Sequence, residues 1–171
     1  MKTFYTFFLF LICNYFYAQT DDSFIKEIKE YVIKIDSINK LDLYNTNYVI
    51  SISDGIIEMN NKVVGGYGIR TLSDIENNFI YRINYGGGTD LYIHKTYYYQ
   101  TNKLCYAVFE INDYKNKLGK IYLKEEFYKN DKKISSIVTV NKLDEKNRNE
   151  TDISLFDDGV KYFNDKKNNS H

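Results

Sequence analysis

The pattern of apolar and polar residues opens with a helical period. Between Ser23 and Asn39, apolar residues recur at steps of three and four, which places them on one stripe of a helix. The polar face carries mixed charges rather than the basic residues of a membrane-surface helix, so the pattern predicts a helix that packs on a sheet. The stripe is formed by Phe24, Ile25, Ile28, Tyr31, Val32, Ile35 and Ile38.

Beyond Asn39 the period changes to two, which is typical of half-buried strands. The clearest alternation runs from Phe79 to Tyr85. Asp54-Gly55 and Asn60-Asn61-Lys62 predict tight turns, and glycines within 65–68 and 86–88 are expected to loosen or end strands. The other expected strands cover residues 48–53, 56–59, 63–64, 91–99, 104–111, 121–128 and 134–140.

The C-terminal part reads as a charged loop, a short hairpin and a tail. Two apolar segments, 153–156 and 160–163, flank Asp157-Asp158-Gly159, which has turn chemistry. The fold class we expect is therefore α+β, with one N-terminal amphipathic helix packed on an antiparallel β-meander sheet. The expected organisation is a segment 1–18 that is removed, a single domain 19–163 and a disordered polar tail 164–171.

One aromatic and polar pattern recurs in the centre of the chain. Tyr98 to Leu104 is echoed by Phe127 to Ile134, and more faintly by the segment that begins at Tyr162. In the first two, strand-forming aromatic residues precede an Asn- and Lys-bearing turn, and an apolar residue follows it. The pattern predicts two adjacent antiparallel hairpins in one sheet.

These hairpins resemble those of small secreted proteins of Bacteroidota with repeated aromatic/Asn-Lys hairpins. They are more distantly similar to the Tyr-Tyr-x-x-Gly-x-Leu unit of MORN-type repeats. The likeness covers Tyr97–Phe109 and Glu126–Val138, and both copies lack the glycine of the MORN turn. It implies a meander of hairpins, and no functional residue follows from it.

The first twenty residues have the order of regions found in a signal peptide. Lys2 precedes an apolar run, and the small residue Ala18 offers a cleavage point, with Gln19 and Thr20 as alternatives. The run is shorter than the roughly 20 residues that span a bilayer. Cys13 follows Ile12 rather than a small residue, so no lipoprotein is expected. We predict a periplasmic or secreted protein with no stable membrane span after cleavage.

Composition narrows the classes of function. Lys plus Arg and Asp plus Glu are both 23, and this balance argues against a dedicated nucleic-acid binder. After cleavage Cys105 is the one remaining cysteine, so no internal disulfide is expected. The 18 tyrosines accompany abundant Asn, Lys and Ile, a bias that genome composition explains as well as a binding surface does.

Few residues offer chemistry. His94 lies alone on an expected strand, where ordinary packing or exposure on the sheet face competes with catalysis. Cys105 would need a histidine partner to act as a nucleophile and otherwise reads as a small buried apolar residue. Glu110, Glu125 and Glu126 could place carboxylates on neighbouring strands, although a glycosidase needs two of them about 5–10 Å apart in a cleft. A solvated sheet face also explains them.

No motif points to a cofactor or a metal. A strand rather than a helix follows Gly86-Gly87-Gly88, so a phosphate-binding loop is not expected there. There is no Cys-x-x-Cys or His-x-x-x-His spacing and no calcium loop. No catalytic residue, metal site or cofactor is therefore assigned.

The function we expect is that of an exported, non-enzymatic interaction protein, in one version an immunity or inhibitor protein. Strand alternation places Tyr92, His94 and Tyr98 on one sheet face and Tyr97 and Tyr99 on the other. A single helix covers one face, so the face of Tyr92, His94 and Tyr98 is the expected site for a protein partner, with the sheet edge as an alternative. A second layer that buries this face as core is the competing arrangement. The alternative function is a small hydrolase that uses His94 and sheet carboxylates.

Overall fold

The computed structural model describes residues 21–38, 47–76, 78–143 and 151–169. The chain divides into two compact units, residues 1–38 and residues 39–171. The expected signal peptide and its cleavage point at Ala18 lie outside the described residues. In the first unit, residues 21–38 are helical, so the expected amphipathic helix is confirmed. None of the helices among the described residues is both long and apolar enough to cross a membrane.

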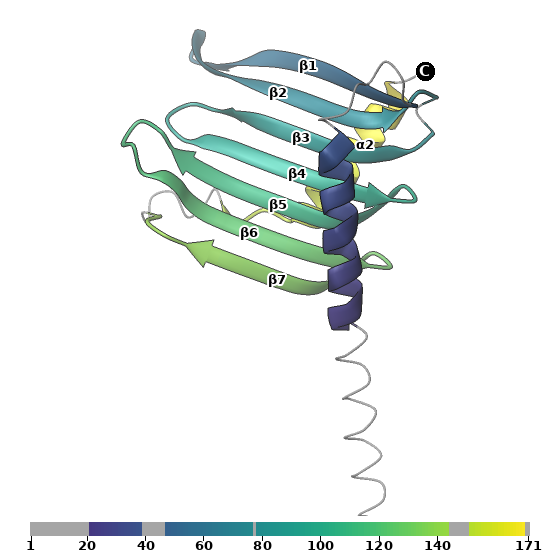
Figure 1. The fold of residues 1–171 in the computed structure, drawn as a ribbon. Coiled ribbons are helices and arrows are strands. Elements are labelled where there is room, and N and C mark those ends of the chain that lie inside the picture. Colours follow the sequence, from purple (N-terminus) through teal and green to yellow (C-terminus); the bar gives the residue numbers. More distant parts are fainter. Residues whose placement is uncertain (1–20, 39–46, 77, 144–150, 170–171) are drawn as a thin grey trace, which may run out of the picture. The chain divides into compact units, whose positions relative to one another are not determined.

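The second unit is a seven-stranded antiparallel sheet whose spatial order follows the chain, as Figure 1 shows. Sequential antiparallel strands need only short turns, so the expected meander is confirmed. The strands are β1 (Tyr48–Met59), β2 (Lys62–Asp74), β3 (Ile80–Gly88), β4 (Tyr92–Gln100), β5 (Lys103–Asp113), β6 (Gly119–Lys129) and β7 (Lys132–Val140).

Three hairpins of the sheet share one turn geometry. The connections of β1–β2, β4–β5 and β6–β7 each consist of two residues with positive φ, Asn60-Asn61, Thr101-Asn102 and Asn130-Asp131. Positive φ at both central residues defines the type I′ turn, whose twist matches that of the flanking strands. The hairpins expected around residues 98–104 and 127–134 are therefore present side by side in one sheet.

Glycines that the sequence assigned to turns lie inside strands. β1 runs unbroken through Asp54-Gly55, β2 includes the glycines at 65–68, and β3 includes those at 86–88. The predicted turn and strand ends there are wrong. One reason is that tyrosine rings cover two of these glycines: a Cβ on Gly55 would meet the Tyr67 ring at 2.7 Å, and one on Gly86 would meet the Tyr92 hydroxyl at 2.3 Å. The cross-strand tyrosine supplies the contact that glycine itself lacks.

The C-terminal hairpin predicted over 153–163 is also wrong, because residues Leu155–Asn168 form the helix α2. Helix α2 extends through 164–168, where the sequence predicted a disordered tail. Ser154 caps it by accepting a hydrogen bond from the Asp157 amide, and acidic residues in the first turn and lysines in the last match the helix dipole. Asp157-Asp158-Gly159 is thus the first turn of a helix rather than a hairpin turn.

Helix α2 covers one face of the sheet, on the far side in Figure 1. Its Leu155 belongs to a core cluster formed mainly by β3 to β6, against which Phe156, Tyr162 and Phe163 also pack. The fit at Gly159 is close, because a Cβ there would lie 2.8 Å from the Tyr97 ring and 3.0 Å from Leu104. The glycine therefore lets the helix backbone approach the sheet.

Candidate functional site

The strand register defines two faces of the sheet. Cross-strand pairing places Ile83, Tyr97 and Ala107 in one row beneath α2, and we call this side the α2 face. The neighbouring row, with Arg82, Tyr98 and Tyr106, lies on the opposite face.

The predicted site residues Tyr92, His94 and Tyr98 lie on the opposite face of β4, as expected from their spacing. They differ in accessibility. The Tyr92 side chain is 40% exposed, His94 is half-buried, and Tyr98 is only 5% exposed beside the Tyr106 ring, at 5.6 Å between centroids. Tyr92 and His94 are therefore available to a partner, whereas Tyr98 is a packing residue. Their role as a site stays a prediction.

A strip of glycines lies beside Tyr92 and His94. In one cross-strand row Ile56 pairs with Gly66, Gly66 with Gly88, and Gly88 with Tyr92. In the next row Asp54, Gly68, Gly86 and His94 follow one another in the same way. We call Gly66, Gly68, Gly86 and Gly88 the glycine strip.

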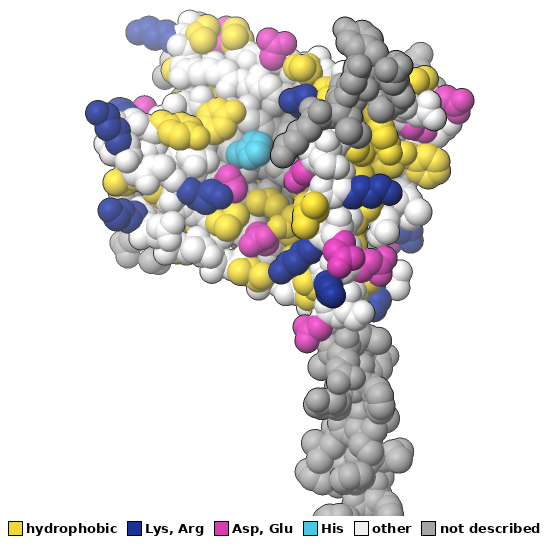
Figure 2. Space-filling view, viewed as in Figure 1, with side chains coloured by type: hydrophobic (Ala, Val, Ile, Leu, Met, Phe, Trp, Pro, Cys, Tyr) yellow, Lys and Arg dark blue, Asp and Glu magenta, His cyan; other side chains and the backbone are white. Residues whose placement is uncertain are grey.

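The glycine strip leaves backbone accessible on its β2 side, where Gly66 is exposed, whereas the Tyr92 ring lies over Gly86 on its β3 side. Among the described residues, a Cβ on Gly68 would find only the Ser53 carbonyl, at 4.0 Å. On the β1 side, Ile52 and Ile56 are 71% and 60% exposed. Figure 2 shows this face, with the histidine in cyan next to apolar side chains in yellow. Sequence reasoning read these glycines as turns and so missed the strip, although two sets of glycine at alternate positions were its signal.

His94 has one carboxylate within reach. Its Nδ1 lies 3.9 Å from Oε2 of Glu110, which pairs with it across β4 and β5. Lys120 also forms an ion pair with Glu110, so the carboxylate is shared. Glu125 lies on the same face and accepts a hydrogen bond from the Tyr106 hydroxyl.

The alternation separates the three candidate glutamates, because Glu126 lies on the α2 face and Glu110 and Glu125 lie on the other.

Cys105 is buried, its Sγ donates to the Tyr98 carbonyl at 3.3 Å, and burial raises the pKa of its thiol to about 12. A thiol held protonated in this way is a poor nucleophile.

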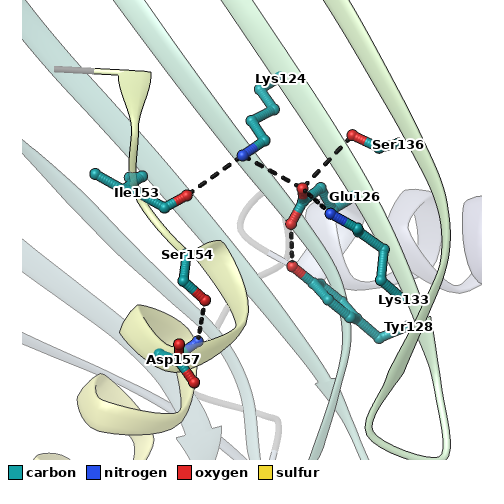
Figure 3. A network of polar contacts seen from close by, with 8 residues as sticks. All are labelled: Lys124, Glu126, Tyr128, Lys133, Ser136, Ile153, Ser154 and Asp157. Atoms are coloured by element: carbon teal, nitrogen blue, oxygen red, sulfur yellow. Dashed lines mark hydrogen bonds and ion pairs between the residues drawn. The ribbon is translucent and has the colours of Figure 1, made fainter. Parts of the chain in front are cut away.

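Glu126 is the centre of a polar cluster on the α2 face, shown in Figure 3. Its Oε1 lies 3.1 Å from Lys133 Nζ and 3.3 Å from Lys124 Nζ, and its Oε2 accepts a hydrogen bond from the Tyr128 hydroxyl. Ser136 contributes a fourth contact at 3.5 Å. Lys124 also donates to the Ile153 carbonyl at 3.3 Å, which ties the cluster to the segment before α2.

Electrostatics keep Glu126 ionised. Burial alone would raise its pKa, but the hydrogen bonds from Tyr128 and Lys133 and the charges of Lys124 and Lys133 outweigh burial and lower it. The pKa of Tyr128 is raised by burial and by donation to the carboxylate. The sequence placed Glu126 on a solvated face, yet it is 3% exposed. The signal was the spacing of Lys124, Glu126 and Tyr128, which puts all three on one face of β6.

Several pockets adjoin α2 on its own face of the sheet. The first, of about 480 Å³, lies beside the Glu126 cluster at the start of the helix. Its lining mixes carboxylates and ammonium groups from Lys124, Glu126, Asp131, Lys133, Asp152 and Asp157. The second, of about 410 Å³, lies between β1–β3 and the end of α2 and presents hydroxyl groups of Ser51, Ser53 and Thr71. Both are open hollows of mixed polarity, and the described residues that line them include neither a histidine nor a cysteine.

No group of three or more His, Cys, Asp or Glu side chains within the described ranges is arranged to hold a metal ion. Comparison of the chain with protein-family models, curated proteins and solved structures finds no match.

Proposed function

We propose that this chain is an exported interaction protein that binds a protein partner through the opposite face, at Tyr92, His94 and the glycine strip. The observation that carries the proposal is the cross-strand row in which exposed Ile56 and Tyr92 flank Gly66 and Gly88. The α2 face is occupied by the chain's own helix, whereas this row leaves backbone and two large side chains accessible.

The chemistry of this surface suits a protein partner. A tyrosine offers an apolar ring and a polar hydroxyl at low entropic cost, and such rings are enriched where proteins meet. The glycine strip allows a partner side chain to approach the sheet backbone between Ile56 and Tyr92. Glu110 and Lys120 add charges of both signs beside His94 at the border. An immunity or inhibitor protein is one version of this function.

The test compares two tyrosines of similar exposure on opposite faces. Tyr67 is 37% exposed and, like Tyr92, lies over glycines, but on the α2 face. A photo-crosslinking residue placed at position 92 should form a discrete adduct in an envelope fraction, and the same residue at position 67 should not. Tyr92→Ala should weaken capture of the adduct partner at least about tenfold, a loss of about 1.4 kcal/mol.

Tyr67→Ala is the matched control and should leave that capture unchanged. Equal adducts at both positions, or none at position 92, would contradict the proposed surface. A genetic neighbour that encodes a toxin would favour the immunity version.

Export is the second part of the proposal. It rests on the order of Lys2, the apolar run and Ala18, followed by a chain with balanced charge. N-terminal sequencing of the protein recovered outside the cytoplasm should begin near Gln19 and lack Cys13. Recovery of an intact Met1 or of a lipidated Cys13 would contradict it.

We also propose that the apolar stripe of the helix over residues 21–38 packs on the antiparallel sheet. Burial of a large apolar side chain is worth about 1.5–3 kcal/mol, and a domain is stable by only about 5–15 kcal/mol. Ile28→Asp should therefore lower the melting temperature sharply, whereas Lys26→Asp at an exposed polar position of the same helix should not. An unchanged melting temperature for Ile28→Asp would contradict packing of the helix.

A second candidate function is hydrolysis, favoured by the 3.9 Å approach of His94 and Glu110. A histidine oriented by a carboxylate can act as a general base. Any hydrolytic activity of the purified protein should then be lost in His94→Ala and in Glu110→Gln. Full activity in both variants would remove this pair, and Glu125→Ala tests a further carboxylate of that face.

A further inference from the structure

Strand β7 forms one edge of the sheet. Its inner side pairs with β6, and none of the described residues pairs with its outer side. An unpaired strand edge presents a row of amide donors and carbonyl acceptors that can pair with a further strand.

The register fixes the direction of the β7 backbone. The Asn141 amide donates to the Ile121 carbonyl at 3.0 Å, so residue 141 points toward β6. Backbone direction alternates along a strand, and the amide and carbonyl groups of residues 136, 138 and 140 therefore point away from β6. Ile134 lies at the register shift between β6 and β7, so the regular outer edge begins after it.

The outer edge lacks the usual protection against pairing. Residues 134–140 carry no charge and consist of Ile, Ser, Val and Thr, and Val138 and Val140 are exposed. Proteins normally blunt an edge with charges, proline or a short strand. The other edge strand, β1, carries Asp54 and Glu58 within its span.

We infer that β7 pairs antiparallel with β7 of a second copy of this chain, about a two-fold axis at Val138. In this register Val138 faces Val138 of the second copy, and Ser136 faces Val140 on either side. Each of these pairs can exchange two backbone hydrogen bonds, because all three residues point outward. The valine side chains meet on the same face. A two-fold contact of this kind closes after two copies.

The outward-facing residues of β7 select this register between two copies. An axis at Val138 gives each of Ser136, Val138 and Val140 a partner from the same set, and the chain bends at Asn141 and Lys142, where the strand ends. An axis at Ser136 would instead place the irregular Ile134 opposite Val138 and lose regular pairs. The register therefore aligns an uncharged centre with itself.

A residue on the two-fold axis faces the same residue of the second copy, and the test uses this symmetry. The full exported chain is examined by sedimentation velocity over a range of concentrations, and it should form a dimer. Val138→Glu alone and Val138→Lys alone should each raise the dimer dissociation constant at least about tenfold, because like charges then face each other. An equimolar mixture of the two variants should restore the dimer. Val138 is 51% exposed and lies opposite Lys124 of β6, so thermal melts check that the fold accepts either charge.

The same pair of charges at Ile52 on the other edge strand is the control and should leave dimer formation unchanged. A monomeric wild-type chain would overturn the inference. Loss of the dimer without rescue in the mixture would overturn the register, and growth into ever larger species would replace it with an open, head-to-tail contact.

Discussion

Helix α2 covers one region of the sheet, whereas the glycine strip on the opposite face is a region with few side chains. Under α2, rows such as Ile83, Tyr97 and Ala107 are almost completely buried. The Tyr97 hydroxyl donates to Asp158 at 2.5 Å, and Lys95 pairs with the same carboxylate at 2.7 Å. At the glycine strip on the opposite face, two positions in each row carry no side chain at all.

The two regions of the sheet therefore have different roles. The covered region obtains its stability from apolar burial and from hydroxyl groups that bond to the helix, and both fix the position of α2. The glycine strip is held mainly by the backbone hydrogen bonds between its strands. Because glycine has no side chain to bury, the strip contributes less stability and leaves surface accessible. Side chains that matter to folding and side chains that matter to binding should therefore separate by region.

The largest effect should come from removing a ring in the covered region. Tyr97→Ala deletes a ring that is 0% exposed and breaks its hydrogen bond to Asp158, so the free energy of unfolding should fall by about 3–5 kcal/mol. Tyr92→Ala removes the same side chain at the glycine strip and should cost less than about 1 kcal/mol. Urea unfolding of the two variants measures the difference. Equal losses would show that the strip is part of the core.

The Glu126 cluster should give the next largest effect. Glu126→Gln removes the charge that accepts from Tyr128, Lys124 and Lys133, and should lower stability at neutral pH by about 2 kcal/mol. The pKa of Glu126 is lowered in the folded state, so its contribution is complete above the ordinary glutamate pKa and is lost as the pH falls through the folded value. The gap between wild type and variant should therefore close on acidification. A gap independent of pH would mean that the charge is not responsible.

The sequence predicted local periodicity well and the covering layer poorly. Alternation in β4 placed Tyr97 and Tyr99 on one face and Tyr92 and His94 on the other, because the two-residue period is a property of the strand itself. Helix α2 was misread because Asp157-Asp158-Gly159 has turn chemistry. Gly159 is a poor helix former whose role comes from contact with Tyr97, a residue 62 positions away. Long-range packing of this kind cannot be recognised from the neighbouring residues in the sequence.

The close approach of α2 to the sheet at Gly159 should also affect stability. Gly159→Ala gains about 1 kcal/mol in helix propensity but places a methyl group 2.8 Å from the buried Tyr97 ring. Overpacking of a buried site costs about 1–3 kcal/mol, so we expect a net loss of about 1 kcal/mol and partial release of α2. Hydrogen exchange of the α2 amides, with urea unfolding, measures both. A stabilised variant would show that the helix does not need this approach.

The smallest effect should have the opposite sign. Among the described residues, a Cβ on Gly68 would find only the Ser53 carbonyl, at 4.0 Å, and its φ is not positive, so Gly68→Ala should raise the free energy of unfolding by about 0.4–1 kcal/mol through the entropy of the unfolded chain. Gly87 lies one row away on the α2 face, where a Cβ would meet Tyr67 at 2.6 Å and the Gly66 carbonyl at 2.8 Å, so Gly87→Ala should destabilise. If the glycine strip contacts a partner, Gly68→Ala should weaken capture at position 92 while it stabilises the fold. A variant that gains stability and keeps full capture would place the partner outside the strip.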